Sequence, residues 1–184
     1  MLKYIVPSFE KRFFMTMLKI SFITSLFAGL YGVIHDQITF TISNEYFMKL
    51  KYQQFHYINF NGNDRIKVSV IGFLATWWVG LFLGWFFARW FLPHCPATIA
   101  CKKIIKSVSI VFIVSVLTAI GGGGFAFSQR EGADYSNWVN ITNTYGIENI
   151  WAFVNVAYIH NCSYLGAFLG FLIALVLVKR KNGS

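Results

Sequence analysis

The chain has 184 residues, of which 56% are hydrophobic, 19% aromatic and only 12% charged, against about 25% charged in an ordinary soluble domain. Its 20 Phe and 6 Trp exceed what a soluble core of this size can bury, so lipid is the natural solvent for much of the surface. A net charge of +9 would suggest nucleic acid in a soluble protein. Its distribution along this chain predicts a membrane anchor and no nucleic-acid partner.

Four segments are long and apolar enough to cross a bilayer, which takes about 20 residues at 1.5 Å per residue. They are 13–34, 68–92, 107–127 and 150–178. Lys19 and Arg89 lie near the ends of the first two, and the other two contain no charged residue. The sequence therefore predicts an all-α membrane protein, with a four-transmembrane-helix bundle as one domain over residues 1–184.

Lysine and arginine predict the orientation of this bundle. With the N-terminus inside, most of the 16 basic residues fall on the cytoplasmic side, which favours N-in and C-in. These residues are Lys3, Lys11, Arg12, Lys19, Arg89, Lys102, Lys103, Lys106, Lys179, Arg180 and Lys181. They should bind anionic lipid at the cytoplasmic face. We expect a retained signal anchor in the first span and a multi-pass protein of a bacterial inner (cytoplasmic) membrane.

This orientation places two loops on the outer side. The first, 35–67, is long enough to need structure of its own. Within it, Ser43 can cap a helix over 45–57, with an ion pair between Glu45 and Lys49 at i, i+4. The segment is rich in aromatic residues and amphipathic, with one side formed by Phe47, Leu50, Gln54 and Ile58. We therefore expect an interfacial helix in this loop. The second outer loop, 128–149, is polar and acidic.

Two of the spans carry a stripe of small residues next to a histidine. The first has Ser21, Ser25, Ala28 and Gly32 before His35, and the last has Ser163, Ala167, Gly170 and Ala174 after His160. Transmembrane helices pack through small residues, and spacings of three and four place each set on one face. Both histidines should therefore face into the bundle near the outer interface. The two stripes match in depth at 1.5 Å per residue, so we expect the two imidazoles within about 10 Å of each other.

Acidic residues surround these histidines in the sequence. Asp36 follows His35, and Glu131 and Asp134 lie just after the third span. Two imidazoles with one or two carboxylates suit a transition metal such as zinc, iron, manganese or copper. An open coordination position would let the metal activate water or oxygen. Without metal the same groups could relay protons, or they could simply be satisfied by neighbouring carbonyls and a capping turn.

Two further patterns allow alternative interpretations. Gly121–Gly124, four consecutive glycines in the third span, permit either close helix contact or local unwinding around a cavity. His94, Cys95 and Cys101 could bind a metal, but their spacing matches no strong zinc pattern. An inert cytoplasmic loop is the simpler interpretation.

Three classes of function remain open. No P-loop, GxSxG, HExxH or CxxCH motif is present. A small membrane metalloenzyme or redox protein agrees best with the titratable groups clustered on the outer side. A transporter or channel subunit is disfavoured because the predicted spans contain no acidic residue. A non-catalytic assembly partner, or a homo-oligomer, would use the outer loops or the small-residue faces as its contact surface.

Overall fold

A computed structural model describes residues 11–58, 62–130 and 132–178 of the chain. Four long helices make up most of this part: α1 (Lys11–Ile42), α3 (Asp64–Phe91), α4 (Ala97–Ser128) and α6 (Ile150–Leu177). Each is long and apolar enough to cross a membrane, and the described residues contain no strand. The predicted all-helical class and the four candidate spans are therefore confirmed.

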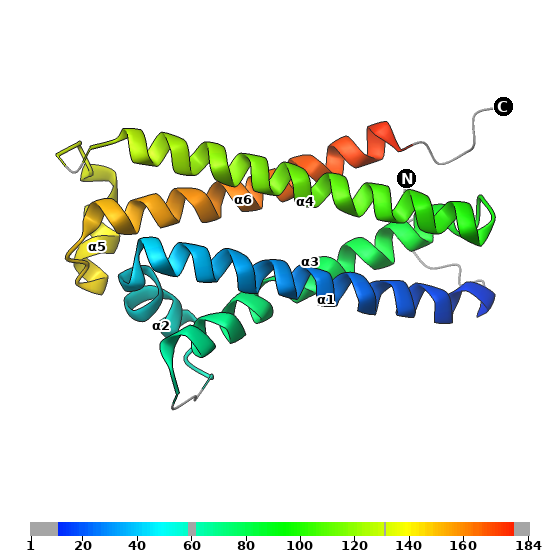
Figure 1. Cartoon of the computed structure of the whole chain (residues 1–184), viewed down its shortest axis with the longest axis horizontal. Coiled ribbons are helices and arrows are strands. Elements are labelled where there is room, and N and C mark those ends of the chain that lie inside the picture. The colour runs from blue at the N-terminus through cyan, green and yellow to red at the C-terminus, as the bar shows by residue number, and fades with distance from the viewer. Residues whose placement is uncertain (1–10, 59–61, 131, 179–184) are drawn as a thin grey trace.

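The four helices form two closely packed pairs, α1 with α3 and α4 with α6 (Figure 1). Contacts between the pairs are fewer and involve mainly α3 with α4 and α1 with α6. Helices α1 and α4 begin at the same end of the molecule. The opposite end, hereafter the capped end, carries the short elements. These are η2 (Tyr46–Lys51), α2 (Tyr52–Gln54), η3 (Ser136–Trp138) and α5 (Val139–Tyr145).

Glycine brings the backbones of α1 and α3 into direct contact. A Cβ added to Gly32 would collide with the carbonyl oxygen of Gly72, and one on Gly72 would collide with that of Gly32. Close approach also lets the Thr76 hydroxyl donate a hydrogen bond across the pair to the Ala28 carbonyl, 2.8 Å away. The small-residue stripe of the first span therefore packs against α3.

The stripe of the last span has a different partner. A Cβ on Gly170 would contact the backbone of Val111 on α4, and Gly166 faces Thr118 on the same helix. The two stripes do not face one another along their length, because each is covered by its own neighbour. Contact between α1 and α6 is far less extensive than contact within either pair.

Helix α4 is continuous through the run Gly121–Gly124. Gly122 and Gly123 are buried, and a Cβ on Gly122 would meet Cys162 of α6. Gly121 and Gly124 have open space on their Cβ side. The glycine run therefore serves close helix contact, and the alternative of local unwinding is not what this helix does.

Helix α1 continues past residue 34, where its predicted span ends, as far as Ile42. Its last turns are attached to the start of α3. The Gln37 side-chain amide donates to the Arg65 carbonyl at 2.7 Å, and the Arg65 guanidinium donates to the carbonyl of Gln37 and to the Thr41 hydroxyl. This extension moves His35 and Asp36 out of the predicted outer loop and into a membrane-length helix.

The predicted loop helix over 45–57 is shorter than expected. It consists of the π-helix η2 followed by the single turn α2, and the backbone N–H of Tyr46 donates to the Ser43 hydroxyl oxygen at 3.4 Å. Phe47 and Leu50 are buried as the pattern predicts, whereas Gln54 is exposed. The buried side of η2 packs in one cluster with residues of α6 such as Phe153. Its position in the membrane interface stays a prediction.

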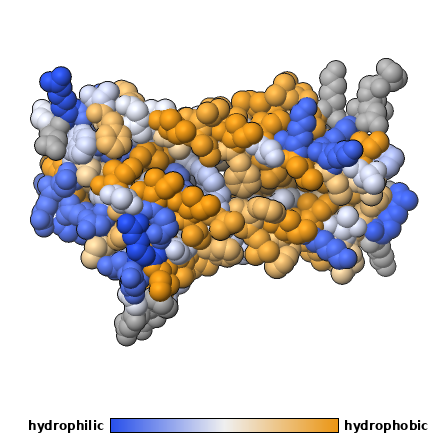
Figure 2. Space-filling model, in the orientation of Figure 1, coloured by the Kyte–Doolittle hydropathy of each residue, from blue (hydrophilic) through white to orange (hydrophobic). Residues whose placement is uncertain are grey.

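The surface agrees with an integral multi-pass membrane protein. On the face shown in Figure 2, apolar residues form a band across the middle and polar residues gather at both ends. Large apolar side chains are exposed on all four long helices, among them Phe22, Trp78, Leu117 and Phe168. Such a surface is stable in lipid. The N-in, C-in orientation and the bacterial inner membrane stay predictions.

Candidate metal centre

His35 and Asp36 come from α1 and His160 comes from α6, one helix of each pair. Helix α1 continues from residue 35 to Ile42, so His35 lies about 10 Å from the capped end of that helix at 1.5 Å per residue. Helix α6 begins at Ile150, which places His160 about 15 Å from its capped end. The histidines are therefore within the helices and not at their ends.

The three side chains converge, as the sequence predicts for the two histidines. The ring centroids of His35 and His160 are 4.6 Å apart in an edge-to-face arrangement. His160 Nε2 lies 3.8 Å from Asp36 Oδ1. One nitrogen or oxygen ligand atom from each of the three residues lies within 4.8 Å of the others. Asp36 is 4% exposed and His160 is 2% exposed, whereas the His35 side chain is half-buried.

The two imidazoles differ in their hydrogen bonding. His160 Nε2 lies 3.3 Å from the Thr39 hydroxyl, and His160 Nδ1 lies 3.4 Å from the Tyr164 hydroxyl. His35 Nε2 is buried and has no hydrogen-bond partner. An unpaired buried polar atom costs about 1–3 kcal/mol. The His35 ring therefore has an unsatisfied nitrogen in the cluster, which is available to coordinate an ion.

Element η2 covers the cluster from the capped end. The Tyr46 ring stacks on His160 with centroids 5.0 Å apart, and Phe47 contacts the same imidazole edge-on at 6.0 Å. Lys51 is also buried. Burial lowers the pKa of the Lys51 amine, and the negative charge of Asp36 partly offsets that effect. A cationic side chain is therefore held near the carboxylate.

Sequence reasoning missed Thr39, Tyr46 and Lys51 as neighbours of the site. Thr39 lies four residues after His35, on the same helical face. Had the first helix been predicted to continue to Ile42, Thr39 would have been recognised as a neighbour of His35. Tyr46 and Lys51 approach the cluster only because η2 folds back over it. Nothing in their local pattern indicates that.

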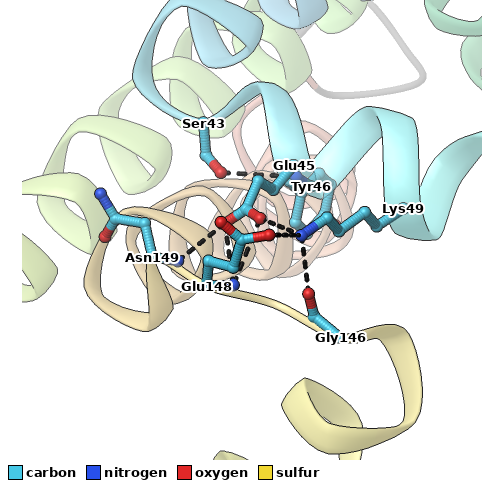
Figure 3. Close-up of polar contacts among 7 residues, drawn as sticks. All are labelled: Ser43, Glu45, Tyr46, Lys49, Gly146, Glu148 and Asn149. Atoms are coloured by element: carbon cyan, nitrogen blue, oxygen red, sulfur yellow. Dashed lines mark hydrogen bonds and ion pairs between the residues drawn. The ribbon is translucent and has the colours of Figure 1, made fainter.

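An ion-pair network ties η2 to the start of α6 (Figure 3). The Glu45 carboxylate accepts hydrogen bonds from the backbone N–H of Glu148 at 3.2 Å and of Asn149 at 2.8 Å, and it pairs with Lys49 as predicted. The Lys49 amine also donates to the Gly146 carbonyl at 2.6 Å. We call these five residues the Glu45–Lys49 clasp. The Glu45–Lys49 clasp holds η2, which covers the site, against the start of α6.

Asp134, another predicted ligand, does not join the cluster. Asp134 is exposed, and its carboxylate accepts a hydrogen bond from the backbone N–H of Ser136 at 2.9 Å. Glu131 lies outside the described residues. The Cys95 thiol is 3.3 Å from the Phe91 carbonyl. Within the described part of the chain, His35, Asp36 and His160 form the one group arranged to hold a metal.

A second polar cluster adjoins the site farther from the capped end. The Tyr31 hydroxyl lies 3.2 Å from the Ser115 hydroxyl and 3.0 Å from that of Ser163. The Tyr31 ring lies 5.7 Å from the His35 ring, centroid to centroid. Tyr31 therefore connects α1 to both α4 and α6 beside the histidines.

Comparison with known proteins adds no family to this description. No protein-family model, curated protein or solved structure matches the chain.

Proposed function

We propose that this protein is a small membrane metalloenzyme or redox protein in which His35, Asp36 and His160 bind a transition-metal ion. The observation that carries the proposal is the convergence of three ligand atoms within 4.8 Å. His35 and Asp36 are neighbours in α1, but His160 comes from a helix of the other pair, so the complete group depends on tertiary packing. Zinc, iron, manganese and copper are the candidate ions, because imidazole and carboxylate suit them.

The dimensions of the cluster fit a metal after a small adjustment. Ligand bonds of about 2.1 Å allow two ligand atoms of one ion to lie at most about 4.2 Å apart. The 3.8 Å between His160 Nε2 and Asp36 Oδ1 satisfies this limit. The whole group spans at most 4.8 Å, so a shift of less than about 1 Å closes it around an ion. Coordination would also satisfy the unpaired nitrogen of His35.

Three protein ligands favour a reactive site over a structural one. Structural zinc sites use four protein ligands, whereas catalytic sites keep a position open for water or substrate. Two histidines and one carboxylate are also the ligand set of many non-haem iron oxygenases. The metal would supply activation of water or oxygen at the open position. With His160 Nε2 as the ligand atom, metal would displace the Thr39 hydroxyl from that nitrogen, and Tyr164 on Nδ1 would orient the imidazole.

A proton-coupled transporter subunit is a second candidate, and the position of Asp36 favours it. The sequence argument against transport was that no acidic residue lies in a span. Asp36 is buried within α1, and an ionisable residue at membrane depth is usually functional. Next to two histidines, it could take part in proton transfer without any metal.

Metal content separates these candidates. Full-length protein purified in detergent and loaded with each ion in turn should hold about one metal ion per chain by elemental analysis. His35→Ala, His160→Ala and Asp36→Asn should each lose it, because shared ligands act together. The double histidine variant should therefore be little worse than either single one.

His56→Ala and His94→Ala are the matched controls, since neither histidine belongs to the cluster. Both should retain the ion. If the wild-type protein binds none of the four metals, or if His35→Ala keeps its metal, the metal centre is excluded and the proton-transfer candidate takes its place.

A further inference from the structure

A groove of about 620 Å³ lies between α1 and α4. These helices belong to different pairs and do not pack closely against one another. The groove is lined by residues within 20–34 of α1 and 101–112 of α4. At 1.5 Å per residue it extends about 21 Å along α1, most of the roughly 30 Å hydrocarbon thickness of a bilayer.

The lining of the groove is almost entirely aliphatic or aromatic. Phe27, Ile34 and Ile105 are its most exposed large side chains. The hydroxyl of Thr24 does not add polarity, because it donates to the Ile20 carbonyl of its own helix at 2.8 Å. The volume falls in the range of small-molecule sites. Its chemistry and its place among membrane-length helices fit a hydrocarbon chain.

One wall of the groove is shared with the candidate metal centre. Tyr31 lines the groove, its hydroxyl belongs to the cluster with Ser115 and Ser163, and its ring contacts His35. Ile34, the residue before His35, also lines it. The groove is therefore apolar along its length and adjoins a polar cluster beside its Tyr31 wall. An amphipathic molecule matches that pattern better than the wholly apolar face of a second copy of the chain.

We propose that this groove binds the hydrocarbon chain of a long-chain lipid substrate, with its polar head at Tyr31 beside His35. The role of the head group rests on the proposed metal site. Binding of the chain does not depend on it, since the groove is formed by α1 and α4 alone.

The test uses a photoactivatable long-chain fatty acid carrying a diazirine in its chain. Full-length protein in phosphatidylcholine vesicles is labelled, and the modified peptides are mapped by mass spectrometry. Labelling should concentrate in 20–34 and 101–112 and should be lost on competition with the unlabelled fatty acid. Ser109→Trp and Ile23→Trp fill the groove and should lose the competed labelling. Ile113→Trp, at an exposed position of α4 outside the groove, should retain it.

Uniform labelling that no competitor reduces, including exposed positions of α6 such as Leu172, would mean bulk lipid contact and overturn the proposal. Cross-links between two copies through this face would overturn it in favour of a dimer interface.

Metal content of the same samples keeps the two proposals distinguishable. Competed labelling of a metal-free protein refutes the metal centre alone, and a loaded protein without competed labelling refutes the lipid groove alone. Unchanged probe affinity in His35→Ala would refute the placement of the head group.

Discussion

Lys51 and Asp36 are buried ionisable side chains of opposite type, with exposed fractions of 9% and 4%. Burying a charge is unfavourable unless another group compensates it. The Asp36 carboxylate raises the pKa of Lys51, against the larger lowering by burial. Each group therefore partly stabilises the charged form of the other. The Lys51 amine also lies where it would repel a metal ion bound by Asp36.

Replacing Lys51 by methionine should tighten metal binding. The change removes a positive charge near the site but keeps an unbranched side chain under the cover formed by η2. Loss of a repulsive charge at partly buried depth should increase affinity at least about tenfold, or roughly 1.4 kcal/mol. Chelator competition on purified protein measures this. Lys19→Met, on the exposed surface near the other end of α1, is the control. Weaker binding in Lys51→Met would show that the lysine instead positions Asp36.

At the scale of elements, η2 forms the cover of the candidate site. Short π-helical segments occur frequently at functional sites, and this one places Tyr46 and Phe47 against His160. The Glu45–Lys49 clasp fixes η2 to the start of α6. The cover therefore depends on a few polar contacts near the surface and should open more readily than the helix pairs.

The clasp should weaken in acid. Burial raises the pKa of Glu45, but hydrogen bonds from Lys49 and from the N–H groups of Asn149 and Glu148 outweigh it, so its pKa lies below the usual 4.5. A carboxylate with a lowered folded-state pKa stabilises the fold fully above its unfolded value. That contribution is lost as pH falls below about 4.5 and through the folded value.

Hydrogen–deuterium exchange of residues 46–51, corrected for the intrinsic rate, should therefore increase as the pH is lowered below that point. Glu45→Gln should show the increased exchange already at neutral pH and little further change in acid. Glu148→Gln, whose side chain is 88% exposed, should change exchange much less. Equal behaviour of the two variants would indicate that the clasp does not hold η2.

Two glycines provide a matched test of the helix pairs. Gly32→Ala forces a methyl group against the Gly72 carbonyl, whereas Gly121→Ala places one in open space. Overpacking of a close contact typically costs about 1–3 kcal/mol, so Gly32→Ala should lower the thermal unfolding temperature in detergent. Gly121→Ala should leave it unchanged or raise it slightly, because alanine favours the helix. Equal destabilisation by both would mean that α1 and α3 are not packed in this way.

At the scale of the whole molecule, the candidate site lies where the two helix pairs meet through α1 and α6. The pairs are otherwise joined by fewer contacts than either has internally. A ligand bound by residues from both pairs would therefore stabilise their association by mass action. It would do so without altering the packing within either pair.

Orientation is a property of the whole molecule that native cysteines can test. Cys101 is exposed near the start of α4, at the end opposite the capped end. If both termini are cytoplasmic, a membrane-impermeant maleimide should label Cys101 in inverted vesicles and not in intact cells. Single cysteines in 36–67 and 128–149 should show the reverse. Labelling of Cys101 from outside intact cells would invert the predicted topology.

Hydropathy and helical spacing were enough to predict the four spans, packing through small residues and the approach of His35 to His160. These are local properties, since about 20 apolar residues cross a bilayer whatever surrounds them. The small-residue stripes predicted close helix packing but not the partner of each helix. A small residue permits close approach by any helix, so the pattern could not say that Gly32 faces α3 and Gly170 faces α4.

Tertiary structure alone decided what completes the site. Four of the five residues of Ile38–Ile42 are β-branched and the fifth is Phe40, a composition typical of strands. Contacts with Arg65 and with His160 nevertheless keep the segment in α1. That continuation turns Asp36 from a loop residue into a buried helical one. Lys51 and Tyr46 join the cluster only through the fold of η2, because long-range contacts that no local pattern encodes hold it against α6.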